Sequence, residues 1–295
     1  MHKTKYVDKP TLKRLSTRSN LWGTWLVFHV WSVIILAMAV GVLYPLTIPL
    51  MIIIIGARQH GMAILVHDAA HGVLFKNRFL NEWISQYFLA APYGGDMQAY
   101  RHYHLKHHKY AQSEDDPDIG LSNKFPVTTD SIQRKFFRDL TGRTFLRLRL
   151  ASLKKTKVIG SEAFNKSSAL PTITANFIIF SVLTYFGAWW SYFVLWLLPL
   201  MTVFFAVLRL RNIAEHAMTS TDNNPLTHAR TTKTNWLSRM IFAPYFVNYH
   251  VEHHAYMYIP CFRLPALHKA MIAAGHGPSM EQKNSYRDVL HAVTI

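Results

Sequence analysis

Two long stretches of the chain carry no Lys, Arg, Asp or Glu: residues 19–57 and residues 167–208. A helix needs about 20 apolar residues to cross the hydrocarbon layer of a bilayer, so each stretch is long enough for two crossings. Pro45 interrupts the first stretch and Gly187 the second. The pattern predicts an all-α integral membrane protein with four transmembrane helices in two hairpins, at residues 21–43, 48–66, 170–188 and 190–208. A soluble protein with long buried helices is less favoured, because such stretches offer no face to water.

The basic residues predict which side of the membrane each segment faces. Lys and Arg are dense in residues 1–18, 76–166 and 209–287, whereas the two tight connections within the hairpins have none. By the positive-inside rule, the amino terminus and both long segments face the cytoplasm. We therefore expect one domain, residues 1–295, in which residues 1–20, 67–169 and 209–295 lie on the cytoplasmic side and form a helical cap. In a bacterium this would be a multi-pass protein of the inner membrane. A cleaved signal peptide is not expected, because the apolar run is far longer than an h-region.

The amino-acid composition limits which kinds of functional site the protein can contain. The 295 residues include 17 His, more than the 16 Asp and Glu together, but only one cysteine, Cys261. A single cysteine excludes an internal disulfide, a zinc site built from several cysteines and a CxxC redox pair. The formal net charge of +16 is explained by the basic cytoplasmic segments. No motif that reads RNA or DNA accompanies it, so no nucleic-acid partner is expected. The histidines indicate a metal site.

Eight of the histidines fall in three clusters. His67 and His71 close the second predicted span, in the sequence HDAAH. The sequence HLKHH follows about thirty residues later and contains His104, His107 and His108. The sequence HVEHH comes after the fourth span and contains His250, His253 and His254. Residues at i, i+3 and i+4 share one face of a helix, so each cluster can aim two or three imidazoles at one point. Neutral imidazole is a good ligand for iron, zinc or copper.

A ninth candidate ligand is His216, which follows the fourth span in the sequence RNIAEH, with Asn212 four residues before it. Eight or nine imidazoles are too many for one ion, since a closed zinc site takes four ligands. They suit two metal ions. Acidic neighbours could accept the second imidazole N–H or could be solvated loop residues: Asp68, Glu215, Glu252 and the run at residues 115–118. The orienting role is modestly favoured for Asp68 and Glu252 alone.

At these motifs the sequence resembles the membrane fatty acid desaturase superfamily, which also includes carotenoid ketolases and hydroxylases. The resemblance covers most of the chain: two hairpins, then HDAAH, HLKHH, NIAEH and HVEHH in the family's order. It implies a non-haem di-iron centre that activates O2 with two externally supplied electrons and abstracts hydrogen from an unactivated C–H bond. It further implies that the irons are bound by His67, His71, His104, His107, His108, His216, His250, His253 and His254, with Asn212 matching an asparagine that contacts iron through water.

The expected function is therefore an O2-dependent oxidoreductase that introduces a double bond into a lipid acyl chain. A hydroxylase or ketolase that acts on a carotenoid or another hydrophobic substrate is the alternative. The chain lacks the HPGG motif of a fused cytochrome b5, so electrons would come from a separate ferredoxin or cytochrome b5-type protein. A membrane zinc hydrolase is disfavoured by the absence of HExxH. A metal transporter is disfavoured because its ligands should lie inside the spans.

Two further features of the sequence each allow two interpretations. Residues 131–150 alternate basic side chains with Phe and Leu. This pattern suits a helix at the anionic inner surface of the bilayer and equally a helix packed on the cytoplasmic cap. His60 would share a helix face with His67 and His71, so it could contact substrate or simply mark where the helix leaves the lipid. We do not count His60 among the ligands.

Overall fold

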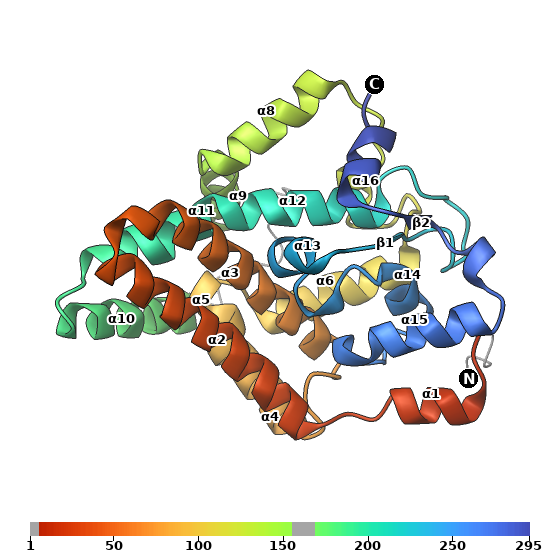
Figure 1. Ribbon diagram of the computed structural model, residues 1–295, viewed down its shortest axis with the longest axis horizontal. Helices are drawn as coiled ribbons and strands as arrows, with labels where there is room; N and C mark the ends of the chain where they lie inside the picture. Colours follow the sequence, from red (N-terminus) through yellow and green to blue (C-terminus); the bar gives the residue numbers. More distant parts are fainter. Residues whose placement is uncertain (1–5, 155–168) are drawn as a thin grey trace.

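The structure is a computed structural model, and it describes residues 6–154 and 169–295. Most of these residues are helical (Figure 1). The first half contains α1 (Lys9–Leu15), α2 (Asn20–Leu43), α3 (Ile48–Ala70), α4 (Arg78–Ile84), α5 (Ala91–Tyr93), α6 (Met97–Tyr110), α7 (Ile119–Ser122), α8 (Thr129–Leu140) and α9 (Arg143–Lys154). The second half contains α10 (Ala169–Tyr185), α11 (Leu198–Met201), α12 (Val203–His216), α13 (Trp236–Ile241), α14 (His250–Ala255), α15 (Leu264–Ala273) and α16 (Tyr286–Ala292).

Short elements complete the described chain. The strands β1 (Thr231–Thr232) and β2 (Gln282–Lys283) pair in parallel. Single turns of 3-10 helix lie at Pro45–Thr47, Pro244–Phe246, Cys261–Arg263 and Gly277–Ser279, and six-residue π-helical turns at Ser85–Ala90 and Tyr192–Leu197. The predicted all-helical fold class is confirmed. The predicted cytoplasmic segments include residues 1–5 and 155–168, which lie outside the described residues.

Three helices of the described chain are long and apolar enough to cross a membrane: α2, the continuous helix Pro45–Ala70, and the continuous helix Tyr192–His216. They match the first, second and fourth predicted spans. The third prediction corresponds to α10, an apolar helix of 17 residues. Two helices run further than predicted: α3 continues to Ala70 and α12 to His216. The sequence pattern marked where apolar residues give way to polar ones, but each helix continues with its polar residues buried in the protein.

The apolar helices pack closely where their side chains are small. α2 and α3 form an antiparallel pair, and α3 also lies against α11 and α12 (Figure 1). At Gly56 of α3, an added Cβ would lie 2.5 Å from Cβ of Val203 and 3.2 Å from the carbonyl oxygen of Pro199. Real side chains do not approach so closely, so glycine is what lets the second and fourth long helices meet here.

Gly56→Val is therefore expected to destabilise the protein without touching any candidate ligand. Overpacking a close helix contact typically costs about 1–3 kcal/mol. A thermal unfolding scan in detergent should show a lower Tm. Ile55→Val, a shrinking substitution at the neighbouring and fully buried position, should cost only about 0.5–1.5 kcal/mol. An unchanged Tm for Gly56→Val would mean that α3 does not meet α11 and α12 as described.

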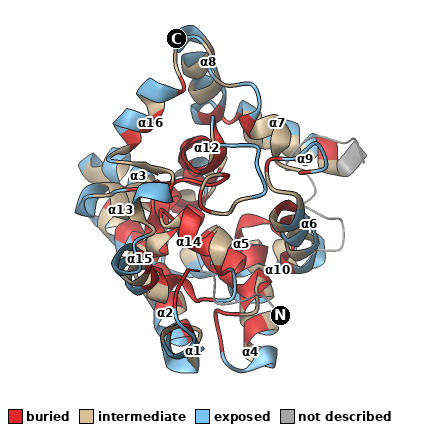
Figure 2. Ribbon diagram, turned by 90° about the vertical axis from the view of Figure 1, so that its right-hand side faces the viewer, coloured by how far each residue is buried: buried red, intermediate tan, exposed pale blue. Residues whose placement is uncertain are grey.

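The elements that carry the other histidines lie towards one end of the long helices. Figure 1 shows α6, α14, α15 and the two strands in the half of the molecule where α3 and α12 end. Figure 2 looks at this end: α12 is seen nearly end-on and buried, α14 lies beside it, and the exposed residues lie on outer elements such as α1, α4 and α16. The ends of α3 and α12 thus converge with α6 and α14 inside the protein. All four carry predicted ligands.

Candidate metal centre

Four helices bring the nine predicted histidines together. α3 contributes the pair at its carboxyl end, α6 and α14 contribute three each, and α12 contributes its last residue. Asp96 caps the start of α6, because its carboxylate accepts the N–H of Ala99, so the local sequence fixes where that helix starts. The histidines form two groups, each with its candidate ligand atoms within 4.8 Å of one another: His67, His71, His104, His108 and His253; and His107, His216, His250 and His254.

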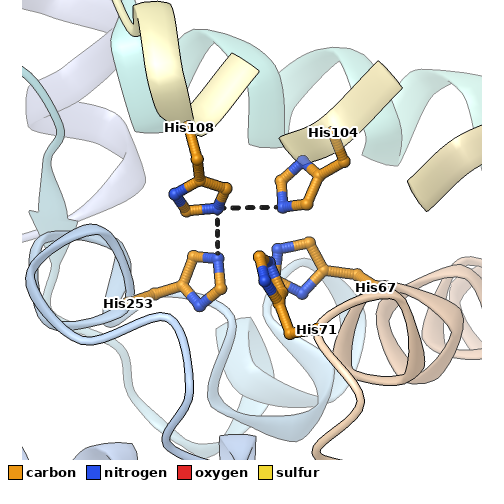
Figure 3. A group of neighbouring side chains, drawn as sticks. All are labelled: His67, His71, His104, His108 and His253. Atoms are coloured by element: carbon orange, nitrogen blue, oxygen red, sulfur yellow. Dashed lines mark hydrogen bonds between the residues drawn. The ribbon is translucent and has the colours of Figure 1, made fainter. Parts of the chain in front are cut away.

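The first group surrounds a single point (Figure 3). Nε2 of His108 lies 3.0 Å from Nε2 of His104 and 2.9 Å from Nε2 of His253. A neutral imidazole carries one ring proton, so these nitrogens cannot all satisfy one another by hydrogen bonds. Both ring nitrogens of His67 and Nε2 of His71 are buried without a hydrogen-bond partner. Two ligands bound about 2.1 Å from one ion and at right angles would be about 3.0 Å apart. The spacing therefore fits a metal ion.

The second group repeats this geometry. Nε2 of His250 lies 2.9 Å from Nε2 of His216 and 3.1 Å from Nε2 of His254. The two groups adjoin, because the ring centroids of His108 in the first and His254 in the second are only 4.4 Å apart. Two ions held in this way would be close neighbours with histidines between them.

Burial keeps most of these imidazoles neutral. It lowers the pKa of His104, His108, His253 and His254 well below the usual value. Burial, with the charges of Arg101 and His107, lowers the pKa of His71 to about 3. A ring that is already neutral at pH 7 offers a lone pair without first losing a proton. The donor set is thus prepared for a metal ion rather than for acid–base work.

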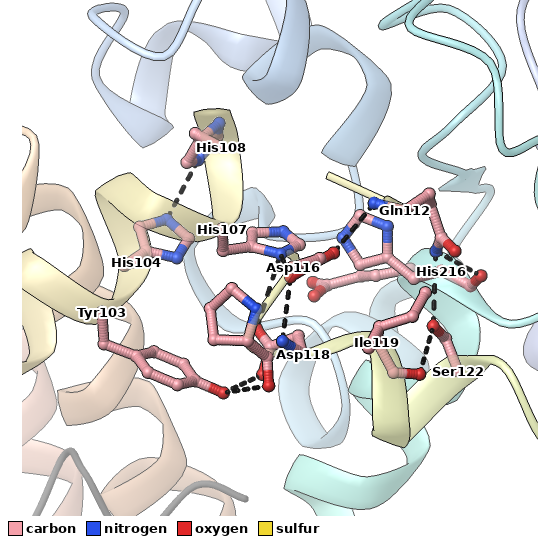
Figure 4. A network of polar contacts seen from close by, with 12 residues as sticks. Tyr103, His104, His107, His108, Gln112, Asp116, Asp118, Ile119, Ser122 and His216 are labelled. Carbon is pink, nitrogen blue, oxygen red and sulfur yellow. Dashed lines mark hydrogen bonds and ion pairs between the residues drawn. The ribbon is translucent and has the colours of Figure 1, made fainter. Parts of the chain in front are cut away.

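His107 differs because two carboxylates, those of Asp116 and Asp118, lie beside it (Figure 4). Its Nδ1 lies 2.8 Å from Oδ1 of Asp116. Burial acts to lower the pKa of His107, but the hydrogen bond that its ring donates to Asp116 and the negative charges of Asp118, Asp116 and Glu215 outweigh burial, so the net pKa is raised. Asp116 is itself held by the backbone N–H groups of Gln112 and Asp118, at 2.8 Å each. These bonds fix the carboxylate of Asp116, whose Oδ1 in turn holds Nδ1 of His107, and Nε2 of that ring is left for the second group.

Asp116→Ala is expected to weaken metal binding at the second group without removing a candidate ligand. Loss of such a partner typically costs about 10–100-fold in metal affinity. Asp115→Ala is the matched control, since Asp115 precedes it and is exposed. Competition against a chelator of graded strength, followed by metal analysis, measures both. Equal retention of metal by the two variants would contradict this role for Asp116.

The other acidic neighbours differ in what they contact. Glu215 accepts a hydrogen bond from Nε of Arg211 at 2.6 Å and lies 3.5 Å from Nδ1 of His250. Asp68 accepts the backbone N–H of Cys261 at 2.8 Å, and its other oxygen lies 3.8 Å from Nδ1 of His67. The carboxylate of Glu252 instead contacts His268 and the hydroxyl of Thr231, neither of which is a candidate ligand.

Several supporting residues gave no clear signal in the sequence. Nδ1 of His216 donates to the backbone carbonyl of His228 at 3.0 Å, which directs its Nε2 towards the second group. Because every residue has a backbone carbonyl, the sequence could not show that the carbonyl of His228 is the acceptor. Tyr245 and Phe246, just before the third cluster, have positive φ angles of 55° and 63°. Bulky residues rarely adopt this conformation, and such strain is concentrated near functional sites.

Asn212 lies one turn before His216 in α12, and its side chain is partly exposed. Its contact with iron through water stays a prediction.

A small cavity adjoins both histidine groups: it has room for about one water molecule and is lined by Ile64, His67, Asp68, Val247, His250, His253, Cys261 and Leu264. Half of the lining residues are apolar or carry a thiol: Ile64, Val247, Cys261 and Leu264.

The geometry defines a class: a helical membrane protein with two adjoining groups of mostly buried histidines, each able to hold a metal ion. Comparison with known proteins agrees. The fatty acid desaturase family profile matches residues 43–283, and the chain belongs to this family. It is 28% identical over 236 residues to dihydrorhizobitoxine desaturase from Bradyrhizobium elkanii, covering 75% of this chain and 66%, just under two thirds, of that relative. It is 23% identical over 260 residues to beta-carotene ketolase from Paracoccus sp. (strain PC1), covering 88% and 93%.

Proposed function

We propose that the protein is an O2-dependent di-iron oxidoreductase that introduces a double bond into the acyl chain of a membrane lipid. The observation that carries the proposal is the meeting of nine histidines, six buried and three partly buried, in two adjoining groups at the ends of apolar helices. A hydroxylase or ketolase of a carotenoid or similar substrate is the second candidate. It is favoured by the similarity to a beta-carotene ketolase over nearly the full length of both chains.

The proposed iron ligands are the nine histidines, with Asn212 acting through water: His67, His71, His104, His107, His108, His216, His250, His253 and His254. When bound, a pair of irons would supply O2 activation with two electrons from a separate carrier. The chain's own part is positional. Asp116 and the carbonyl of His228 hold the rings of His107 and His216 by hydrogen bonds, and the carboxylate of Glu215 lies 3.5 Å from Nδ1 of His250.

The proposed disposition in the membrane is four crossings with a cytoplasmic cap, in one domain spanning residues 1–295. The charge-free stretches and the basic segments between them support it. A centre at the inner surface meets an oily substrate that enters from the bilayer. It also meets a ferredoxin or cytochrome b5-type donor that arrives from the cytoplasm.

Expression in a bacterial host with a compatible ferredoxin or cytochrome b5 system tests the proposal. Mass spectrometry of total lipids and pigments should detect a product that depends on both the protein and O2. Loss of two hydrogens identifies desaturation, whereas gain of oxygen identifies the second candidate. A product formed equally well without O2 would indicate a hydrolase and overturn the oxidoreductase assignment.

A further inference from the structure

α8 and α9 form a bent pair of helices joined at Gly142, which has a φ of +72°. Figure 1 places this pair beside α11 and the beginning of α12. A Cβ on Gly142 would lie 3.4 Å from the end of the Met201 side chain, in α11. The bend therefore touches one of the long apolar helices rather than the histidine centre.

Polar contacts fix the inner side of this pair. Asp139 is fully buried and paired with Arg209 of α12, with 2.8 Å between Oδ1 and Nη2. Arg149 donates to the carbonyl oxygens of Gly94 and Tyr93, at 2.8 Å and 2.6 Å. Arg209 is also the first charged residue after the charge-free stretch 167–208. The Asp139–Arg209 pair thus holds the bend at the level where that stretch ends.

The outer side combines exposed apolar and basic side chains. Leu146 and Leu150 of α9 are 50% and 54% exposed, and Arg143 and Arg147 on the same helix face are also exposed. Positions i, i+3, i+4 and i+7 make this one continuous stripe. Phe137 of α8 extends it, with its ring 57% exposed and 5.5 Å from the guanidinium of Arg143. We call these five side chains the α8–α9 stripe.

We propose that the α8–α9 stripe lies in the headgroup layer of the cytoplasmic leaflet and binds anionic lipid. Its Leu and Phe side chains would enter the acyl boundary, while its two arginines extend to the lipid phosphates. The choice of occupant follows from the stripe's position where the charge-free stretch 167–208 ends and from its charge, since it has two arginines and no acid. An acidic electron carrier would meet the arginines but would leave the alternating leucines against water or a polar surface.

Depth measurement by spin labelling tests this without any substrate. Cys261 is the one cysteine and is buried, so a Cys261→Ser background permits single labels. One label replaces Leu146; the matched control replaces Asp288, exposed on α16. In nanodiscs of phosphatidylcholine with phosphatidylglycerol, the Leu146 label should be several-fold more accessible to O2 than to a polar nickel reagent. The Asp288 label should show the reverse. Equal nickel access at both sites would overturn the proposal.

Hydrogen–deuterium exchange on the native sequence provides a second measurement that does not depend on the cysteine-free background. Amides of residues 143–150 should exchange several-fold more slowly in nanodiscs containing phosphatidylglycerol than in phosphatidylcholine alone. Arg143→Gln with Arg147→Gln should remove this difference. If exchange is the same in both lipids, or slows only when an acidic ferredoxin is added, the stripe does not bind anionic lipid.

Discussion

Replacing His107 with alanine is expected to abolish product formation and to lower the iron content from two ions per chain towards one. His107 is buried, belongs to the second histidine group and is held by Asp116. Removing a ligand should cost more than the roughly 10–100-fold loss of affinity that follows removal of an outer partner. Metal analysis of the purified membrane protein, together with product assay in the host, measures both effects.

The matched control is His102→Ala, on the same helix but exposed to solvent. It should retain full iron content and activity. Membrane insertion should be normal in both variants, because neither position lies in an apolar span. A His107→Ala protein that keeps two irons and normal turnover would contradict the assignment of the second group.

Glu215→Ala is expected to cause a large loss of stability. The carboxylate is buried and paired with Arg211, which also hydrogen-bonds Tyr100. Removing one partner of a buried pair leaves the other charge uncompensated and typically costs about 3–5 kcal/mol. The Tm of the detergent-solubilised protein should fall by roughly 10 °C.

A double replacement separates the charge effect from simple loss of packing. Arg211→Met combined with Glu215→Gln removes both charges while keeping similar volume, so it should recover most of the lost Tm. Glu215 also lies near Nδ1 of His250, so the double variant should still bind iron less tightly than the native protein. A double variant as unstable as Glu215→Ala would show that the pair does not account for the loss.

The sequence predicted the helical fold because helices that cross a membrane require long stretches without charged residues. Residues 19–57 and 167–208 lack charge, and helices occupy most of both stretches. The ends of α3 and α12 were harder to predict. The predicted spans end at residues 66 and 208, just before polar residues such as Asp68 and Arg211, whereas both of these are buried in the protein.

The candidate site was predictable to the extent that it depends on side-chain identity. Histidines at i, i+3 and i+4 had to share a helix face, and all nine predicted histidines belong to the two groups. Which histidines share a group was not predictable, because the cluster on α6 divides: His107 joins one group, His104 and His108 the other. The partners of the ligand rings were not predictable either: Asp116 was one of several acidic residues at positions 115–118, and the sequence does not reveal a backbone carbonyl such as that of His228 as an acceptor.

The most direct test of the central claim is the metal content of the purified protein, by mass spectrometry of its elements, on native protein from iron-replete cells. The account predicts close to two irons per chain and little zinc. An active preparation that holds zinc alone, or a chain that holds no iron, would contradict it.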